Sequence, residues 1–261
     1  PPINMLDNST TGKEPESTET TRDSFTRVAA IQMTAGPNIW GNLEEAARLL
    51  ELAAAEGAKL AALPEYFCLM GMSDVDKVAV CEQANRGPIQ EFLSKTAKRL
   101  GLWIVGGTVP LVSSRPDKVR NSCLVYDDKG EQVARYDKIH LFGLELGTER
   151  YAEEETIEAG CGVVVVDSPF GRMGLSICYD LRFPEWSRNS MGYDLLLYVA
   201  SWPDVRRMHW KQLLIARAIE NQCFVAGVNR IGRDENDLAY CGDTMIVDYQ
   251  GETLCHAAFT E

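Results

Sequence analysis

The chain has 261 residues, of which 45% are hydrophobic, and a formal net charge of −12 at pH 7. A chain of this length can bury a sizeable core, and its acidity argues against nucleic acid or an anionic membrane as a partner, because both require clustered Lys and Arg. No apolar run approaches the roughly 20 residues that cross a bilayer, so we expect no membrane-spanning segment.

The eight cysteines are irregularly spaced and include no C-x-x-C pair of the kind that holds zinc or exchanges disulfides. We therefore expect no metal site, and free thiols in a reducing compartment. The N-terminus lacks a basic region followed by an apolar one, the pattern of a secretory signal. These features predict a soluble, cytoplasmic protein.

Residues 1–25 are rich in Ser, Thr, Glu, Asn and Pro and almost free of large apolar side chains. Such a segment cannot offset its own ordering entropy, so we expect a disordered N-terminal tail. No repeat or second linker interrupts the remainder. Residues 26–261 are therefore predicted to form a single domain.

The ordered part is predicted to begin with a buried strand at residues 28–33, a helix capped by Asn42, and a second strand at residues 59–63. A helix at residues 88–100 and an apolar run at residues 103–109 repeat this arrangement. Strands joined through helices pair in parallel with right-handed crossovers. The order therefore favours an α/β fold with parallel strands.

Glu65 follows the second predicted strand directly after Pro64, among aromatic and apolar neighbours. Binding and catalytic groups of α/β sheets gather at the carboxyl ends of strands. Glu65 is therefore a candidate functional carboxylate. The alternative is a surface acid that caps the next segment.

Residues 119–126 and 131–136 predict a hairpin that leads to Lys138. The apolar and aromatic segment that follows could remove water from this lysine and so perturb its pKa. A solvated lysine is the alternative, and we expect His140 to be a structural histidine bonded to backbone. Residues 143–160 then predict a long acidic loop in which most glutamates face water.

A second predicted hairpin, formed by residues 163–166 and 173–177, ends on Cys178. Pro184 with Glu185 is typical of the first turn of a helix, so Cys178 would lie at a strand-to-helix bend. Such a bend lifts the side chain off the sheet and aims free backbone N–H groups, including that of Tyr179, at whatever the sulfur attacks. A small buried hydrophobe is the alternative.

The remaining chain predicts an apolar strand at residues 194–200, an amphipathic helix at residues 205–221, a strand at residues 224–228 and a closing hairpin.

Several motifs occur in order along the chain: PEY (64–66), YDKIHLF (136–142), GLSICYDLRFPE (174–185), ARAIENQ (216–222) and GVNR (227–230). With them the chain resembles the nitrilase or carbon–nitrogen hydrolase superfamily from Arg27 to its end. The resemblance implies a four-layer α-β-β-α sandwich in a single domain, paired into homodimers or larger assemblies. Because such domains usually continue through another strand, it also implies a domain cut short at Glu261.

The resemblance further implies roles for individual residues. Cys178 matches the nucleophile, Glu65 the general base, and Lys138 the residue that stabilises the tetrahedral intermediate. Glu153 matches a second glutamate that positions the lysine and the attacking groups. Tyr179 and the residues after it look like the Nit amidase branch, whose members hydrolyse small amides that often bear carboxylates, including ω-amides of 2-oxo acids and deaminated glutathione.

We therefore expect a thiol-dependent hydrolase that acts on a small carboxylated amide through a cysteine thioester, with neither metal nor organic cofactor. A site that holds one lysine and two glutamates needs a further cation to accept a carboxylate, and Arg182 is our candidate, with a structural salt-bridge partner as its alternative. Other hypotheses are a non-catalytic binding protein on the same fold, a nitrilase or N-carbamoyl hydrolase, and an acyltransferase that uses an amine in place of water.

Overall fold

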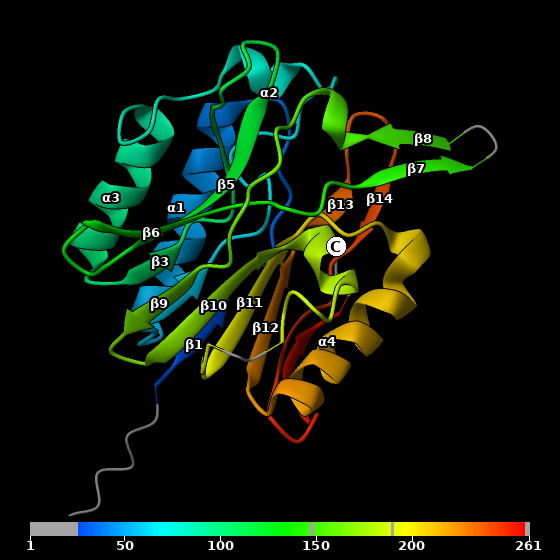
Figure 1. Cartoon of the computed structure of the whole chain (residues 1–261). Coiled ribbons are helices and arrows are strands. Elements are labelled where there is room, and N and C mark those ends of the chain that lie inside the picture. Colours follow the sequence, from blue (N-terminus) through cyan, green and yellow to red (C-terminus); the bar gives the residue numbers. More distant parts are fainter. Residues whose placement is uncertain (1–25, 147–148, 189–190, 259–261) are drawn as a thin grey trace, which may run out of the picture.

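The computed structural model describes residues 26–146, 149–188 and 191–258, and the predicted tail at residues 1–25 lies outside them (Figure 1). In the described residues, two six-stranded sheets form the centre of the fold. The first contains β1 (Val28–Ala30), β2 (Leu60–Ala62), β3 (Trp103–Val105), β5 (Val119–Tyr126) and β4 (Val109–Val112) in this order, with β6 (Gln132–Asp137) beside β5.

The second sheet has the order β16 (Thr253–Ala257), β15 (Thr244–Val247), β12 (Phe224–Asn229), β11 (Leu195–Ala200), β10 (Gly171–Ile177) and β9 (Val165–Ser168). Three longer α-helices flank the sheets in Figure 1, with α1 (Ile39–Ala55) and α3 (Pro88–Leu100) on one side and α4 (Arg207–Asn221) on the other. A short helix, α2 (Asp76–Ala79), lies between α1 and α3 in the sequence.

Side chains of the first sheet alternate between two apolar cores. Leu60 and Val105 pack in a core with residues of the second sheet, whereas Ala61 and Ile104 pack in a core with residues of α1 and α3. This alternation is the period of two that a strand imposes, and burial on both faces explains why the strands are apolar throughout. On the second sheet, α4 lies so close to β12 that a Cβ at Gly227 would approach Leu214 to 2.4 Å. The expected α/β single-domain fold is confirmed.

The parallel strands of both sheets end at the same region of the molecule. β1, β2 and β3 are parallel in the first sheet, and β10, β11 and β12 are parallel in the second. Glu65 lies just beyond β2, and Ser201 directly follows β11. The backbone N–H of Ser201 donates to the Glu65 carboxylate over 2.9 Å, so the carboxyl ends of the two sheets are in direct contact.

The backbone just after β2 packs against Gly107, which lies in the segment between β3 and β4. Gly107 has φ +50, and a Cβ at this position would lie 2.1 Å from the carbonyl oxygen of Pro64. Only glycine allows both the left-handed conformation and the close approach. The apolar run predicted at residues 103–109 is therefore broken here into β3 and β4.

Two local predictions were wrong. Helix α1 is capped by Asn38, whose side chain accepts from Gly41 N–H, while Asn42 is buried and donates to the carbonyls of Gly36 and Cys68. Either asparagine could serve as a cap, but the side chain of Asn42 is taken up by its hydrogen bonds to buried backbone carbonyls, which leaves Asn38 as the cap.

Residues 143–160 contain a hairpin of β7 (Gly143–Leu146) and β8 (Glu149–Ala152), followed by a 3₁₀ helix at Glu153–Glu155, where a loop was expected.

The chain after Cys178 also differs from its prediction. Residues Cys178–Arg182 form a 3₁₀ helix, and Pro184 lies in turns, where the start of an α-helix was expected.

A second small sheet pairs β13 (Ile231–Arg233) with β14 (Ala239–Cys241), and a 3₁₀ helix at Asp204–Arg206 leads into α4. Among the residues described, no helix is both long and apolar enough to cross a membrane.

Candidate active site

Glu65 is almost completely buried, with 1% of its surface exposed, and its carboxylate accepts hydrogen bonds at both oxygens. Oε1 accepts from Asn121 Nδ2 and from Lys138 Nζ, each over 2.9 Å. Oε2 accepts from the Ser201 backbone N–H. A buried carboxylate is tolerated only when such donors replace the lost water, and here they also fix its orientation.

Lys138 lies just beyond the end of β6, and its side chain has no exposed surface. Its ammonium contacts the Glu65 and Glu153 carboxylates, each over 2.9 Å. One buried cation therefore lies between two carboxylates. Since the charges do not cancel, the cluster carries a negative charge when all three groups are ionised.

Glu153 begins the 3₁₀ helix that follows the β7–β8 hairpin, and its carboxylate points inward. Its Oε2 accepts from Phe142 N–H over 2.7 Å, and its Oε1 accepts from the Tyr66 hydroxyl over 3.3 Å. The hairpin thus delivers this one glutamate of the acidic run to Lys138. Composition alone could not separate it from its neighbours Glu154 and Glu155.

Cys178 directly follows β10 and opens the 3₁₀ helix, with a backbone φ of +46. This left-handed conformation is strained for a residue with a side chain, and strain of this kind clusters at functional sites. The thiol and the Glu65 carboxylate lie close enough for each to shift the pKa of the other. The Tyr179 N–H has no intrahelical partner, because the first N–H groups of a helix cannot have one. The side chain is only 8% exposed, so the bend does not lift it clear of the core.

Burial and charge set the protonation of these groups. Burial raises the pKa of the Cys178 thiol well above its ordinary value, and the nearby Glu65 carboxylate raises it further. Burial also raises the pKa of the Glu65 carboxyl, while the Lys138 ammonium opposes that shift. Burial by itself would lower the pKa of Lys138, but the Glu153 and Glu65 carboxylates outweigh it, and the pKa is raised. At neutral pH these shifts keep the Lys138 ammonium charged and the Cys178 thiol protonated.

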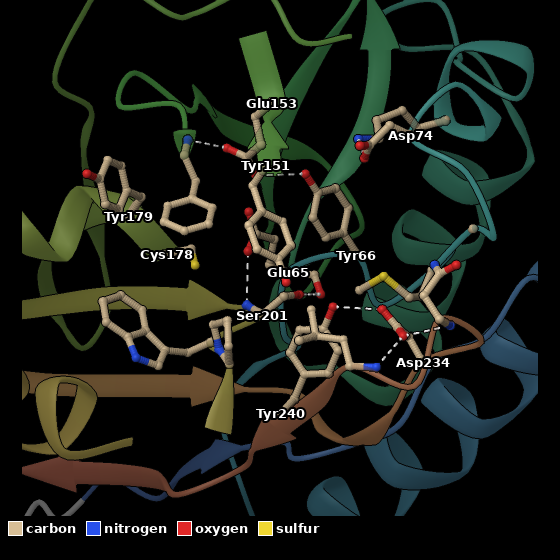
Figure 2. A pocket seen from close by; sticks show the side chains of 18 of the residues that line it. Glu65, Tyr66, Asp74, Tyr151, Glu153, Cys178, Tyr179, Ser201, Asp234 and Tyr240 are labelled. Atoms are coloured by element: carbon tan, nitrogen blue, oxygen red, sulfur yellow. Dashed lines mark hydrogen bonds and ion pairs between the residues drawn. The ribbon is translucent and has the colours of Figure 1, made fainter. Parts of the chain in front are cut away.

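Glu65, Glu153 and Cys178 line a pocket of about 590 Å³, shown in Figure 2. Lys138 lies behind this wall, in contact with both glutamates. Cys178 and Glu65 face the same space, and the rings of Tyr66, Tyr151 and Tyr240 surround it. The pocket is wide enough for a small organic molecule. A thiol and a base at the wall can attack a carbonyl carbon, and an ammonium directly behind them can stabilise the oxyanion that forms.

Arg182 lines the same pocket, at the end of the 3₁₀ helix that Cys178 begins. Its guanidinium lies 4.9 Å from the centroid of the Trp202 ring, and its Nη2 lies 2.9 Å from His209 Nδ1. Neither of these partners is a carboxylate, so the described contacts give no support to a structural salt bridge. Burial lowers the pKa of the guanidinium from its ordinary value.

Sequence reasoning missed two residues that hold Glu65 in place. Asn121 is a buried polar residue within β5, and Ser201 is the first polar residue after the apolar strand β11. Each gave a signal, since a polar side chain in or just after an apolar strand needs a partner. The sequence could not say that both partners belong to Glu65: Asn121 Nδ2 donates to its carboxylate, and the Ser201 hydroxyl donates to its backbone carbonyl. In the described part of the chain, no group of three or more His, Cys, Asp or Glu could hold a metal ion.

Comparisons with known proteins agree on one family. The family model described as carbon-nitrogen hydrolase matches residues 27–261. A deaminated glutathione amidase from Yersinia enterocolitica is 35% identical over 233 residues, which cover 87% of this chain and 81% of the relative. An omega-amidase from Escherichia coli (strain K12) is 36% identical over 232 residues, which cover 87% of this chain and 84% of the relative.

A similar solved structure is that of a CN-hydrolase superfamily protein from Xanthomonas campestris, which has an arsenic adduct in its active site. It aligns with a TM-score of 0.77 at 35% identity, over 90% of this chain and 86% of the other. The family match at residues 27–261 includes all the candidate residues.

Replacing Lys138 by Met removes the cation between the two carboxylates and should destabilise the fold in a pH-dependent way. We expect the free energy of unfolding at neutral pH to fall by about 3–5 kcal/mol, as when one partner of a buried ion pair is lost. Without the ammonium, burial raises the Glu65 pKa further. A carboxyl whose folded-state pKa exceeds its unfolded one stabilises the fold only when protonated, so the deficit should shrink as pH falls through the raised pKa towards 4.5.

Chemical denaturation of Lys138→Met and wild type between about pH 7 and about pH 5 measures this deficit. The matched control is Glu65→Gln combined with Lys138→Met, which removes both charges and should recover part of the loss. A deficit in Lys138→Met that stays constant over this pH range would contradict the assignment of the unpaired charge to Glu65.

Proposed function

This chain belongs to the carbon–nitrogen hydrolase family, and on that premise we propose that it hydrolyses a small carboxylated amide through a thioester on Cys178. The observation that carries the proposal is the buried contact of Lys138 Nζ with Glu65 Oε1 beside the Cys178 thiol, with Glu65 and Cys178 at the wall of a pocket. These groups supply a nucleophile, a base and an oxyanion donor at one point.

The acylation half of the reaction begins with the protonated thiol. The Cys178 proton passes to Glu65 as Sγ forms a bond to the amide carbonyl carbon. The carbonyl oxygen becomes an oxyanion, which the Lys138 ammonium and the Tyr179 N–H stabilise; one such donor contributes about 3 kcal/mol. The C–N bond then breaks, and Glu65 returns the proton to the departing nitrogen. Ammonia or an amine leaves, and a thioester remains.

Deacylation uses the same groups. Glu65 takes a proton from water, and the oxygen of that water bonds to the thioester carbon. The oxyanion forms again beside Lys138 and collapses, which breaks the C–S bond. The cysteine sulfur recovers the proton, and the carboxylic acid leaves. Glu153 positions Lys138 in both halves, since it contacts the ammonium and is itself held by the Phe142 N–H.

A carboxylate on the substrate is supported by charge and by the named relatives. The buried cluster of Lys138 with two glutamates is negative, so an anionic substrate needs a cation outside it. Arg182 and Arg206 both line the pocket and lie close enough to each other that Arg206 lowers the pKa of Arg182. A carboxylate between them would relieve this repulsion. The relatives named as deaminated glutathione amidase and omega-amidase support an amidase of the Nit branch.

Replacing Cys178 by Ser should lower kcat by about 10⁴-fold or more, because the hydroxyl is a far weaker nucleophile at the same position. Mass spectrometry of the wild type with a slow amide should show an acyl adduct on Cys178. Cys223→Ser is the control, since Cys223 is also buried but does not line the pocket, and it should keep its activity. An adduct on another cysteine, with Cys178→Ser still active, would contradict the assignment of Cys178 as the nucleophile.

Replacing Arg182 by Met should lower kcat/KM for carboxylated amides by about 10- to 100-fold, the usual effect of losing a hydrogen bond to a charged group. The measurement compares ω-amides of 2-oxo acids and deaminated glutathione with nitriles, N-carbamoyl amino acids and uncharged aliphatic amides. Wild type should prefer the carboxylated amides, and Arg115→Met, an exposed arginine paired with Asp117, should behave as wild type. A preference for nitriles or uncharged amides would reject the substrate class, whereas an unchanged preference in Arg182→Met would remove Arg182 alone.

A further inference from the structure

Asp180 is a fully buried carboxylate that receives four hydrogen bonds. Its Oδ2 accepts from the Tyr136 hydroxyl over 2.7 Å and from Ile177 N–H over 2.9 Å. Its Oδ1 contacts His140 Nδ1 over 2.7 Å and accepts from His140 N–H over 3.1 Å. The prediction of a backbone partner for His140 was therefore wrong, because the partner of its ring is this carboxylate.

The donors to Asp180 flank the two groups that the proposed reaction uses. Tyr136 and His140 lie two residues before and two residues after Lys138, and Ile177 directly precedes Cys178. Tyr136 belongs to β6 of the first sheet, and Ile177 ends β10 of the second. The Asp180 carboxylate is therefore hydrogen-bonded both to the segment of the first sheet that carries Lys138 and to the segment of the second sheet that carries Cys178.

The bend at Cys178 needs such a restraint, because a left-handed residue relaxes unless its surroundings hold it. The Asp180 side chain accepts from the N–H of Ile177, so one hydrogen bond connects the residue before Cys178 with a residue after it and restrains the bend. The His140 ring stacks on Phe183 with centroids 3.7 Å apart and an interplanar angle of 10°. The His140 ring also packs edge-on against the Trp186 ring, with an interplanar angle of 81°. Packing against these two aromatic rings therefore fixes the histidine ring that contacts Asp180.

We propose that Asp180, with His140 and Tyr136 as its donors, is a positioning residue that keeps the Cys178 thiol in line with Glu65 and Lys138. The inference rests on the proposed function of these three groups. None of Asp180, His140 and Tyr136 is among the described residues that line the pocket, so they act through Cys178 and Lys138 and do not touch the substrate. A displacement of about 1 Å at a reacting group can slow a reaction about 100-fold.

Asp180→Asn tests the proposal because it keeps the size of the side chain but turns an NH₂ group towards donors. We expect kcat to fall about 100-fold while KM changes little, since binding groups are untouched. Asp243→Asn is the matched control. Asp243 is also buried and contacts a histidine ring, His256, over 2.7 Å, but its partners His256 and Arg207 flank neither Cys178 nor Lys138. It should lose stability and keep its kcat.

The pH dependence of Cys178 alkylation by iodoacetamide gives a readout that a purely structural role would not move. In the wild type, burial and the Glu65 carboxylate raise the Cys178 pKa, with Lys138 opposing and Glu153 adding to the shift. When the bend relaxes, the thiol leaves this environment, so its pKa should fall towards the ordinary value of about 8.5. Mass spectrometry of the Cys178 peptide measures this pKa in Asp180→Asn, Asp243→Asn and wild type.

The histidine supplies a rescue test that leaves the carboxylate in place. His140→Asn keeps an N–H close to the position of Nδ1 and should retain most of the activity, whereas His140→Leu should lower kcat about tenfold. If Asp180→Asn does not fold, His140→Leu and Tyr136→Phe carry the test, because each removes one donor only.

Kinetics and alkylation of Asp180→Asn that match those of Asp243→Asn would overturn the proposal. So would wild-type kcat in both His140→Leu and Tyr136→Phe. If the wild type hydrolyses none of the amides, the proposed function fails, while the alkylation profiles still decide whether Asp180 positions the thiol.

Discussion

A lysine ammonium buried between two carboxylates is the contact on which the site depends. Burying a charge costs several kcal/mol unless opposite charges and hydrogen bonds replace the lost water. Lys138 and Glu65 meet that condition together, and Glu65 draws its remaining donors from Asn121 and from Ser201 on the other sheet. The two sheets must therefore meet at their carboxyl ends for the cluster to be stable.

The same contact sets the chemistry that the site can perform. Because the pKa of the Cys178 thiol is raised, the sulfur is protonated at rest and needs a base during attack. Glu65 lies beside it, with its own pKa raised by burial, and so is suited to accept that proton. The two carboxylates raise the pKa of the Lys138 ammonium, so it stays charged for the role that we propose for it at the oxyanion. Burial thus favours general-base catalysis over a preformed thiolate.

The sequence predicted the parts of this arrangement that depend on local pattern. Glu65, Lys138 and Cys178 each follow a strand pattern, and their motifs and order led to the family that the comparisons support. It could not predict contacts that depend on which strands become neighbours. Ser201 is 136 residues from Glu65, and only the approach of the two sheets brings its N–H to the carboxylate.

Local ambiguity explains the remaining differences. Two asparagines could cap the first helix, and burial of Asn42 in the adjoining loop left Asn38 as the cap. Proline with an early acid also fits a turn, which is what Pro184 forms after the 3₁₀ helix at Cys178. The acidic run held one inward glutamate, Glu153, and only the hairpin before it determines which one. In each case a pattern allowed two structures, and long-range packing selected one.

The central claim is that Glu65 and Lys138 act on Cys178 as one unit. Single-turnover acylation rates of Glu65→Gln, Lys138→Met and the double variant test it most directly. We expect each single variant to slow acylation by about 10³-fold or more, and the double variant to be slower than the worse single by no more than about tenfold, because either change disables the same step. A double variant whose loss equals the product of the two single losses would contradict the account.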